Sequence, residues 1–253
     1  MISPFTALRS LGRALLLIPV FSAGILLPGT TSAVIQDELS PPAKRDGKQP
    51  AANELEQDLI KKGLVSADML DPSIIVDLKY ADRDNFMGEN LYRGLNRAFL
   101  VPEAAKKLVM ASQILQERYP DLRILVGDAV RPRSVQKEMW RLVVNTPQQP
   151  YVANPKLGSM HNYGAAVDVT LFNVKTGKRV DMGTPLDYFG PLAQPLLESA
   201  FLRQGKLTPS QIENRLILRN AMLDAGWYTI NIEWWHFNAF PKIFIRSNYK
   251  FIE

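Results

Sequence analysis

The pattern of hydrophobic and polar positions divides the chain into periodic segments separated by polar loops. Apolar residues recur at every second position over residues 74–80, which predicts a half-buried strand. The apolar run at 122–127 is typical of a central strand, and residues 166–172 form a second strand-like run. A last strand is expected near the C-terminus, where it carries the stretch 231–237.

Helix boundaries are marked by capping residues and by proline and glycine. A short helix is predicted after Asn53 and ends at Gly63. Pro102 fits the first position of a longer helix that runs to about residue 119. Thr208, followed by proline and by a glutamine three positions on, predicts the start of a helix that ends at Gly226. One more helix is expected over residues 134–144.

These elements predict an α+β fold, because helices and strands mix without the regular alternation that produces a parallel sheet. We expect a single domain over residues 53–253, with a largely antiparallel central sheet flanked by helices. Two long polar segments, 81–97 and 145–158, are predicted loops. The first is long enough to be a working loop of a functional site and not a simple connection.

The N-terminus has the features of a secretion leader. Arg9 and Arg13 precede an apolar run over residues 14–27, and small residues at 31–33 provide a cleavage site. The alternative is a membrane anchor, but the run is shorter than the roughly 20 residues that a span needs. We therefore expect residues 1–33 to be a signal peptide, 34–52 a flexible linker, and the protein to be exported, to the periplasm or another extracytoplasmic space, without a membrane span after cleavage.

Composition excludes few classes beyond this. Hydrophobic residues make up 46% and charged residues 22% of the chain, as in ordinary globular proteins. The net charge of +5 is modest, and no stripe of lysine and arginine interleaved with aromatic residues is present, so no nucleic acid partner is expected. The chain has no cysteine, which excludes disulfides, so its core must stabilise an exported protein, together with any bound metal.

The candidate chemistry centres on the only two histidines among 253 residues, His161 and His236. Asp168 follows the first by seven positions, and Glu233 precedes the second by three. Two imidazoles and a carboxylate suit Zn²⁺ and leave a fourth position open, as in catalytic zinc sites. His161, Asp168 and His236 are therefore the candidate zinc ligands. Glu233 is placed to act as general base on a water molecule.

The backbone must bend within both pairs, His161 with Asp168 and Glu233 with His236, if their side chains are to meet at one site. On a straight strand, residues seven or three apart point to opposite faces, so the chain must bend between His161 and Asp168, where Gly164 gives it room. A bulge, a turn or a sheet end is expected between Glu233 and His236. Taken singly, each pair is also compatible with a polar loop or with the flanks of a core tryptophan pair, 234–235, which we expect to form a rigid wall of the site.

Arg131 lies at the end of the predicted strand 122–127, where Pro132 favours extended backbone. Its guanidinium could face the developing oxyanion of a tetrahedral intermediate. The alternative is a surface arginine that pairs with Asp128. The residues alone leave these two interpretations open.

Several ordered motifs together resemble the zinc D-alanyl-D-alanine dipeptidases of the vancomycin-resistance type. They are D-x-x-R-P at 128–132, S-x-H-x-x-G-x-A-x-D at 159–168, and E-W-W-H at 233–236. The likeness also includes residues 80–88 and 167–172, extends through 176–187, and so spans about residues 70–245. It departs mildly at 129–130, where relatives often have an aromatic residue, and this bears on fine specificity.

The resemblance implies a role for each site residue. His161, Asp168 and His236 match the zinc ligands, Glu233 the general base and Arg131 the arginine that stabilises the transition state. Two further residues are implied only by the resemblance: Ser159 and Asp187 match the dipeptide-binding pocket, with Asp187 as the partner of the substrate ammonium.

The function expected from these roles is zinc-dependent hydrolysis of D-alanyl-D-alanine, or of a related D,D-dipeptide, in cell-wall metabolism. One alternative is a zinc D,D-carboxypeptidase or endopeptidase that acts on longer peptidoglycan peptides. Another is a wall-binding protein without catalysis, which the open fourth ligand position disfavours. The oligomeric state stays open.

Overall fold

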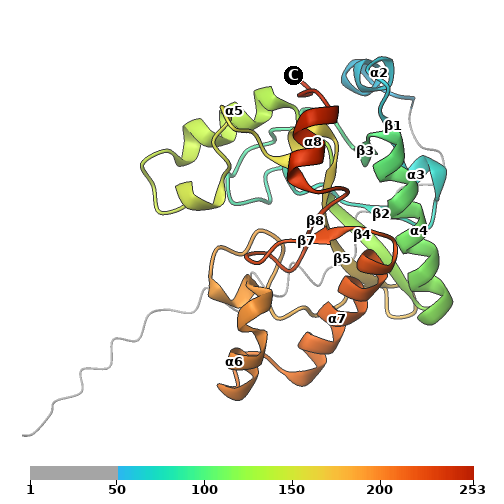
Figure 1. Ribbon diagram of the computed structural model, residues 1–253, viewed down its shortest axis with the longest axis vertical. Helices are drawn as coiled ribbons and strands as arrows, with labels where there is room; N and C mark the ends of the chain where they lie inside the picture. The colour runs from blue at the N-terminus through green and yellow to red at the C-terminus, as the bar shows by residue number, and fades with distance from the viewer. Residues whose placement is uncertain (1–50) are drawn as a thin grey trace, which may run out of the picture.

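Two long antiparallel strands form the centre of a six-stranded sheet in the computed structural model, which describes residues 51–253 (Figure 1). They are β4 (Leu122–Asp128) and β5 (Ala166–Asn173). The strand order is β2-β4-β5-β8-β7, and β6 pairs with β5. The shorter strands are β2 (Ile75–Val76), β6 (Lys178–Arg179), β7 (Tyr228–Thr229) and β8 (His236–Asn238). The predicted α+β class with a largely antiparallel sheet is confirmed; only β2 and β4 pair in parallel.

Two long helices, α4 (Pro102–Arg118) and α7 (Pro209–Asp224), pack against each other and contact β4 and β5 (Figure 1). Their starts lie where the sequence predicts them. Proline occupies the first turn of both helices, and Thr208 forms a capping box with Gln211. Leu108 and Leu218 are completely buried at this contact layer. The hydrophobic core therefore lies between these helices and the central strands.

The other elements are shorter. Helix α2 (Glu54–Lys61) is capped as predicted by Asn53, whose side chain accepts a hydrogen bond from the Glu56 amide. The remaining elements are β1 (Val65–Ser66), which pairs with β3 (Phe99–Leu100), α3 (Ala67–Leu70), η1 (Lys79–Ala81), α5 (Arg133–Val143), η2 (Gln149–Tyr151), η3 (Met160–Tyr163), η4 (Pro191–Ala193), η5 (Pro195–Leu197), α6 (Glu198–Arg203) and α8 (Lys242–Asn248).

The strand predicted over residues 74–80 is much shorter than expected. Its alternating residues are buried as predicted, but ladder pairing is confined to β2 and the next amide, that of Asp77, which donates to Val126 O at 2.9 Å. After Leu78 the chain turns into η1. Alternation predicts which side chains are buried, but it does not predict whether the backbone finds a neighbouring strand. The buried Tyr80 is thereby placed at the pocket described below.

Both expected bends are present. Gly164 ends η3 with a φ of 63°, in the left-handed region that glycine adopts without strain, and β5 begins two residues later. Glu233 lies in an irregular segment, and β8 starts only at His236. The predicted last strand therefore includes only the end of the stretch 231–237.

A third irregularity was not predicted. The register of β4 against β5 shifts between Val126 and Asp128, at Gly127. A Cβ atom on Gly127 would lie 2.3 Å from Leu186 Cδ1, so the absence of a side chain here lets Leu186, next to Asp187, pack directly on the strand. The shift places Asp128 directly opposite Asp168 at the end of the sheet.

The predicted leader, residues 1–33, and nearly all of the predicted linker, 34–52, lie outside the described residues, so both stay predictions. Within residues 51–253, no helix combines the length and the apolar character needed to cross a membrane.

Candidate metal centre and active site

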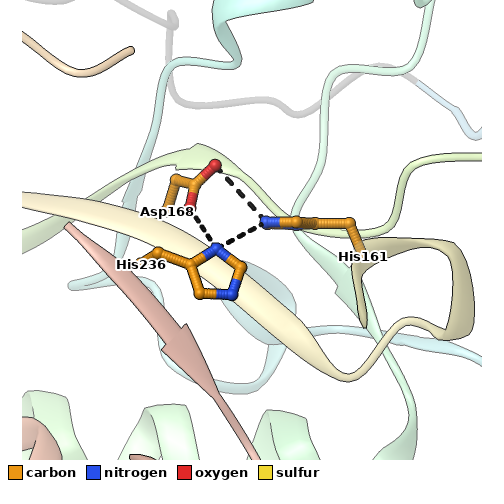
Figure 2. A group of neighbouring side chains, drawn as sticks. All are labelled: His161, Asp168 and His236. Atoms are coloured by element: carbon orange, nitrogen blue, oxygen red, sulfur yellow. Dashed lines mark hydrogen bonds and ion pairs between the residues drawn. The ribbon is translucent and has the colours of Figure 1, made fainter. Parts of the chain in front are cut away.

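The site forms where the ends of three neighbouring strands meet the turn after η3. Asp168 is the third residue of β5; its partner on one side is Asp128 of β4, and on the other side it is His236 of β8. His161 reaches the same point from η3, because the left-handed turn at Gly164 reverses the chain between the helix and the strand. The fold thus brings together the three predicted metal ligands, His161, Asp168 and His236 (Figure 2).

The two imidazole rings are oriented by hydrogen bonds on the side away from the cluster. His161 Nδ1 lies 2.7 Å from the Ala129 carbonyl oxygen, which can only accept, so Nδ1 carries the proton and Nε2 is left as a lone-pair donor. His236 Nε2 lies 3.0 Å from Asn238 Oδ1, which leaves Nδ1 free. Such outer partners are typical of metal-ligating histidines, because they fix the ring nitrogen that faces the ion.

The donor atoms converge closely enough to hold one ion. His236 Nδ1 lies 2.9 Å from Asp168 Oδ1 and 3.2 Å from His161 Nε2, and His161 Nε2 lies 3.3 Å from Asp168 Oδ2 (Figure 2). All three donor atoms lie within 4.8 Å of one another, and all three residues are buried. Two nitrogen donors and one carboxylate in this arrangement fit a divalent transition metal.

Electrostatics at the cluster also favour a cation. Burial works against a charged His161, but Asp168 and Asp128 outweigh it and raise the pKa of this imidazole. Burial likewise works against a charged Asp168, yet both histidines lower the pKa of its carboxyl below the ordinary value. The cluster therefore stabilises positive charge at its centre and keeps the Asp168 carboxylate ionised.

Glu233 lies beside the cluster, in the irregular segment before β8. Its Oε2 atom is 3.8 Å from His236 Nδ1, and 20% of its side chain is exposed. Burial, and after it the charges of Asp168 and Asp187, raise the pKa of Glu233 to about 7, although His236 acts in the opposite direction. A carboxyl group that titrates near neutrality can both accept and return a proton, which is what general acid–base catalysis requires.

Arg131 does pair with Asp128, but it is not on the surface. The two side chains are only 9% and 2% exposed and form a salt bridge, and Arg131 Nη1 donates to Gln136 Oε1 at 3.1 Å. The guanidinium carbon lies 5.3 Å from the centre of the Tyr80 ring. Burial acts to lower the pKa of Arg131, but the Asp128 carboxylate raises it well above its ordinary value. The surface alternative is therefore wrong, and a buried cation lines the pocket.

The two residues implied only by resemblance lie in the same pocket. Ser159 caps η3: its hydroxyl accepts from the His161 amide at 3.4 Å, and its amide donates to Asn162 Oδ1 at 2.7 Å. Asp187 accepts a hydrogen bond from the Tyr80 hydroxyl at 2.7 Å. Burial, reinforced by the nearby Asp168, raises the pKa of Asp187 to about 6. A half-buried carboxylate of this kind attracts a cationic group.

One pocket of about 210 Å³ contains all seven predicted site residues. Its walls also include an aromatic group in which Phe189 contacts Phe86 edge-on and stacks on Tyr151. Phe86 comes from the segment 81–97, which was expected to be a working loop. The tryptophan pair 234–235 is buried but does not line this pocket, so the prediction that it forms a wall of the site is wrong; Trp234 Nε1 donates instead to Thr184 Oγ1 at 2.7 Å.

Sequence reasoning missed several residues that line this pocket or orient its metal ligands. Asn238 follows His236 by two positions on a buried strand, and this spacing on one strand face was the available signal. Tyr80 was predicted only as a buried strand residue. Lys242 and Arg246 of α8 also line the pocket, and no local pattern pointed to them.

A buried set of two imidazoles and a carboxylate, open to a pocket beside a carboxyl that titrates near neutrality, is typical of metal-dependent hydrolases. Comparison with known proteins narrows this class. The profile of the family described as D-ala-D-ala dipeptidase matches residues 61–252, and the chain belongs to that family, which makes it a metallopeptidase.

Curated relatives agree with this membership. The D-alanyl-D-alanine dipeptidase of Escherichia coli is 31% identical over 174 residues, which cover 69% of this chain and 83% of the relative. The enzyme of the same name from Enterococcus faecium is 26% identical over 195 residues (69% and 90%). That of Enterococcus faecalis is 22% identical over 207 residues (76% and 98%).

Proposed function

We propose that the protein is a zinc-dependent dipeptidase that hydrolyses D-alanyl-D-alanine or a closely related D,D-dipeptide. The observation that carries this proposal is the position of Asp187 in the same small pocket as the candidate metal ligands and Glu233. A carboxylate at that place provides a partner for the free ammonium of a dipeptide. The names of the curated relatives support the same substrate.

The ion would be held by His161 Nε2, His236 Nδ1 and the Asp168 carboxylate, a donor set that suits zinc and leaves room for substrate and water. Bound zinc supplies a Lewis acid that polarises the scissile carbonyl and makes water more acidic. Ala129 O and Asn238 Oδ1 keep each ring turned so that the correct nitrogen faces the ion.

Glu233 would take a proton from the attacking water and pass it to the amine that leaves. Its pKa of about 7 fits both halves of this transfer, because the group is neither too weak a base nor too weak an acid near neutral pH. Glu233 directly precedes the buried Trp234 and Trp235, so the backbone that carries its carboxylate is anchored in the core.

Arg131 would stabilise the negative charge that develops on the carbonyl oxygen. Its guanidinium has five N–H donors, and the three hydrogen bonds to Asp128 and Gln136 leave two available for substrate. The Ser159 hydroxyl accepts from the His161 amide, so its own proton is free to donate to a substrate oxygen.

The leader predicted over residues 1–33 supports a location of this reaction outside the cytoplasmic membrane, where D,D-dipeptide units of the cell wall occur. If so, the N-terminus of the protein isolated from an extracytoplasmic fraction should begin near Val34, as measured by intact-mass spectrometry. Recovery of the full-length chain from the cytoplasm alone would contradict this location.

The substrate proposal is tested with the purified, zinc-loaded protein on three peptides: D-Ala-D-Ala, L-Ala-L-Ala, and a tripeptide that ends in D-Ala-D-Ala. We expect efficient release of D-alanine from the first only. Glu233→Gln is the matched control, because it removes the base and keeps the shape. Cleavage of the tripeptide as readily as the dipeptide would favour the carboxypeptidase alternative, and no turnover of any peptide would favour the binding-protein alternative.

A further inference from the structure

Helix α8 (Lys242–Asn248) presents two cations to the pocket. Lys242 and Arg246 are four residues apart, so both lie on one face of the helix. The helix packs against η3, which carries His161, and its Ile245 is completely buried. This buried anchor fixes the helix, so the two exposed side chains extend along the pocket wall from a firmly placed backbone.

Neither cation is neutralised within the described part of the chain. No carboxylate of residues 51–253 lies within ion-pair distance of Lys242 or Arg246, whereas the other cation of the pocket, Arg131, pairs with Asp128. The pocket also contains three carboxylates, Asp168, Asp187 and Glu233. The two cations of α8 and the three carboxylates thus line one pocket without forming ion pairs with each other. Such a pocket is complementary to a ligand that carries one positive and one negative charge.

A dipeptide with free ends is such a ligand, with an ammonium at one end and a carboxylate at the other. We propose that Lys242 and Arg246 bind the C-terminal carboxylate of the substrate, an inference that rests on the proposed dipeptidase function. Arginine pairs with a carboxylate through its planar fork, and lysine adds a mobile point charge. Together with Asp187, the two cations would recognise both termini and so measure the length of the peptide.

This assignment restricts the substrate class. A free carboxylate one residue beyond the scissile bond is present in dipeptides and in peptides cut by carboxypeptidases. It is absent from a bond inside a longer chain. The two cations therefore disfavour the endopeptidase alternative. Asp187, which would pair with a free ammonium, distinguishes a dipeptidase from a carboxypeptidase.

The test compares D-Ala-D-Ala with its C-terminal amide, which has the same shape without the negative charge. The variants are Lys242→Ala, Arg246→Ala and the double variant, with Arg246→Lys as a variant that keeps the positive charge alone. Lys250→Ala is the matched control, because Lys250 is an exposed lysine just beyond α8 that does not line the pocket. Circular dichroism and zinc content confirm that each variant is folded and loaded.

We expect the wild type to prefer the free acid, and the double variant to lose roughly 10- to 100-fold in kcat/KM for it, mainly through KM, as for a hydrogen bond to a charged group. The amide should be cleaved equally by wild type and double variant. Arg246→Lys should restore part of the loss from Arg246→Ala, because it returns the charge without the planar fork, and Lys250→Ala should change nothing. Equal losses on both substrates, or no loss on either, would overturn the inference.

Failure of the proposed function gives a different result, because the wild type then cleaves neither peptide. In that case the binding of N-acetyl-D-alanine, a simple monocarboxylate, is followed by nuclear magnetic resonance titration. Weaker binding to the double variant than to wild type still supports a carboxylate site on α8. Equal affinity for the two proteins overturns it.

Discussion

Asp187 gives the sharpest prediction, because a dipeptidase must distinguish a free ammonium from a peptide bond one residue before the cut. The perturbation is Asp187→Asn, which removes the charge and keeps the shape. The Tyr80 hydroxyl, which donates to Asp187 at 2.7 Å, can donate equally to the amide oxygen of asparagine. The substitution therefore changes the charge of the pocket with little effect on its packing.

The magnitude follows from the electrostatics of the site. Burial, with a further contribution from Asp168, raises the pKa of Asp187 from 3.8 to about 6. That shift means that the pocket disfavours the charged carboxylate by about 3 kcal/mol, or roughly 10²-fold. A substrate ammonium offsets this cost by pairing, whereas an N-acetylated substrate leaves the carboxylate desolvated and unpaired.

The assay is kcat/KM for D-Ala-D-Ala and for N-acetyl-D-Ala-D-Ala on both proteins. We expect the wild type to prefer the free dipeptide by about 10²-fold or more, and Asp187→Asn to reduce this preference to less than about tenfold, mainly by weakening the free dipeptide. Tyr80→Phe is the control: it removes a hydrogen bond that lowers the pKa of Asp187 but keeps the carboxyl group, which can still pair with the ammonium, so the preference should be reduced less than in Asp187→Asn. If the wild type cleaves the acetylated peptide as readily as the free one, the dipeptidase interpretation fails.

Three further predictions address the other roles. His236→Ala should abolish tight zinc binding, and Asn238→Ala should weaken zinc binding by roughly 10- to 100-fold because the His236 ring loses its orienting acceptor. Elemental analysis and competition with a chelator measure both effects. A full equivalent of tightly held zinc in His236→Ala would refute the ligand assignment. Burial raises the pKa of Glu233 to about 7 from 4.5, so its charge reduces stability as the pH rises through this range. In the metal-free protein, Glu233→Gln should therefore raise the free energy of unfolding by about 3 kcal/mol at pH 8 and by less than about 1 kcal/mol at pH 5, measured with urea, and no gain at pH 8 would contradict the shift. Arg131→Ala should lower kcat by roughly 10²-fold with a smaller change in KM. Because the Asp128 carboxylate is then left buried and unpaired, the activity is measured per folded, metal-loaded protein. An effect on KM alone would mean that Arg131 binds the substrate and does not stabilise the transition state.

Local signals in the sequence determined much of the fold. The caps at Asn53 and Thr208 and the proline at 102 placed three helix starts correctly, because capping depends on residues that are adjacent in the chain. The apolar alternation at 74–80 identified buried side chains. It overestimated the strand, since pairing needs a partner about 50 residues away, β4, which no local pattern specifies.

The sequence also determined which residues are available for metal chemistry. With only two histidines, a site of this kind had to use both, and the required bends were correctly expected near Gly164 and before His236. The two pocket residues Ser159 and Asp187 came only from the resemblance to a family. No spacing indicated them, because the contact between Asp187 and Tyr80 joins positions 107 residues apart.

Only the tertiary structure determined the burial, the orientation and the neighbours of these residues. It placed Arg131 and Asp128 in the interior, where their pairing has a different consequence from that of a surface pair. It fixed the two ring orientations through Ala129 O and Asn238 Oδ1, and it placed Lys242 and Arg246 at the pocket. Hydrogen-bond direction, burial and the resulting pKa values depend on the groups that surround a residue in space. Many of these groups are far away in the sequence, so they become neighbours only when the chain folds.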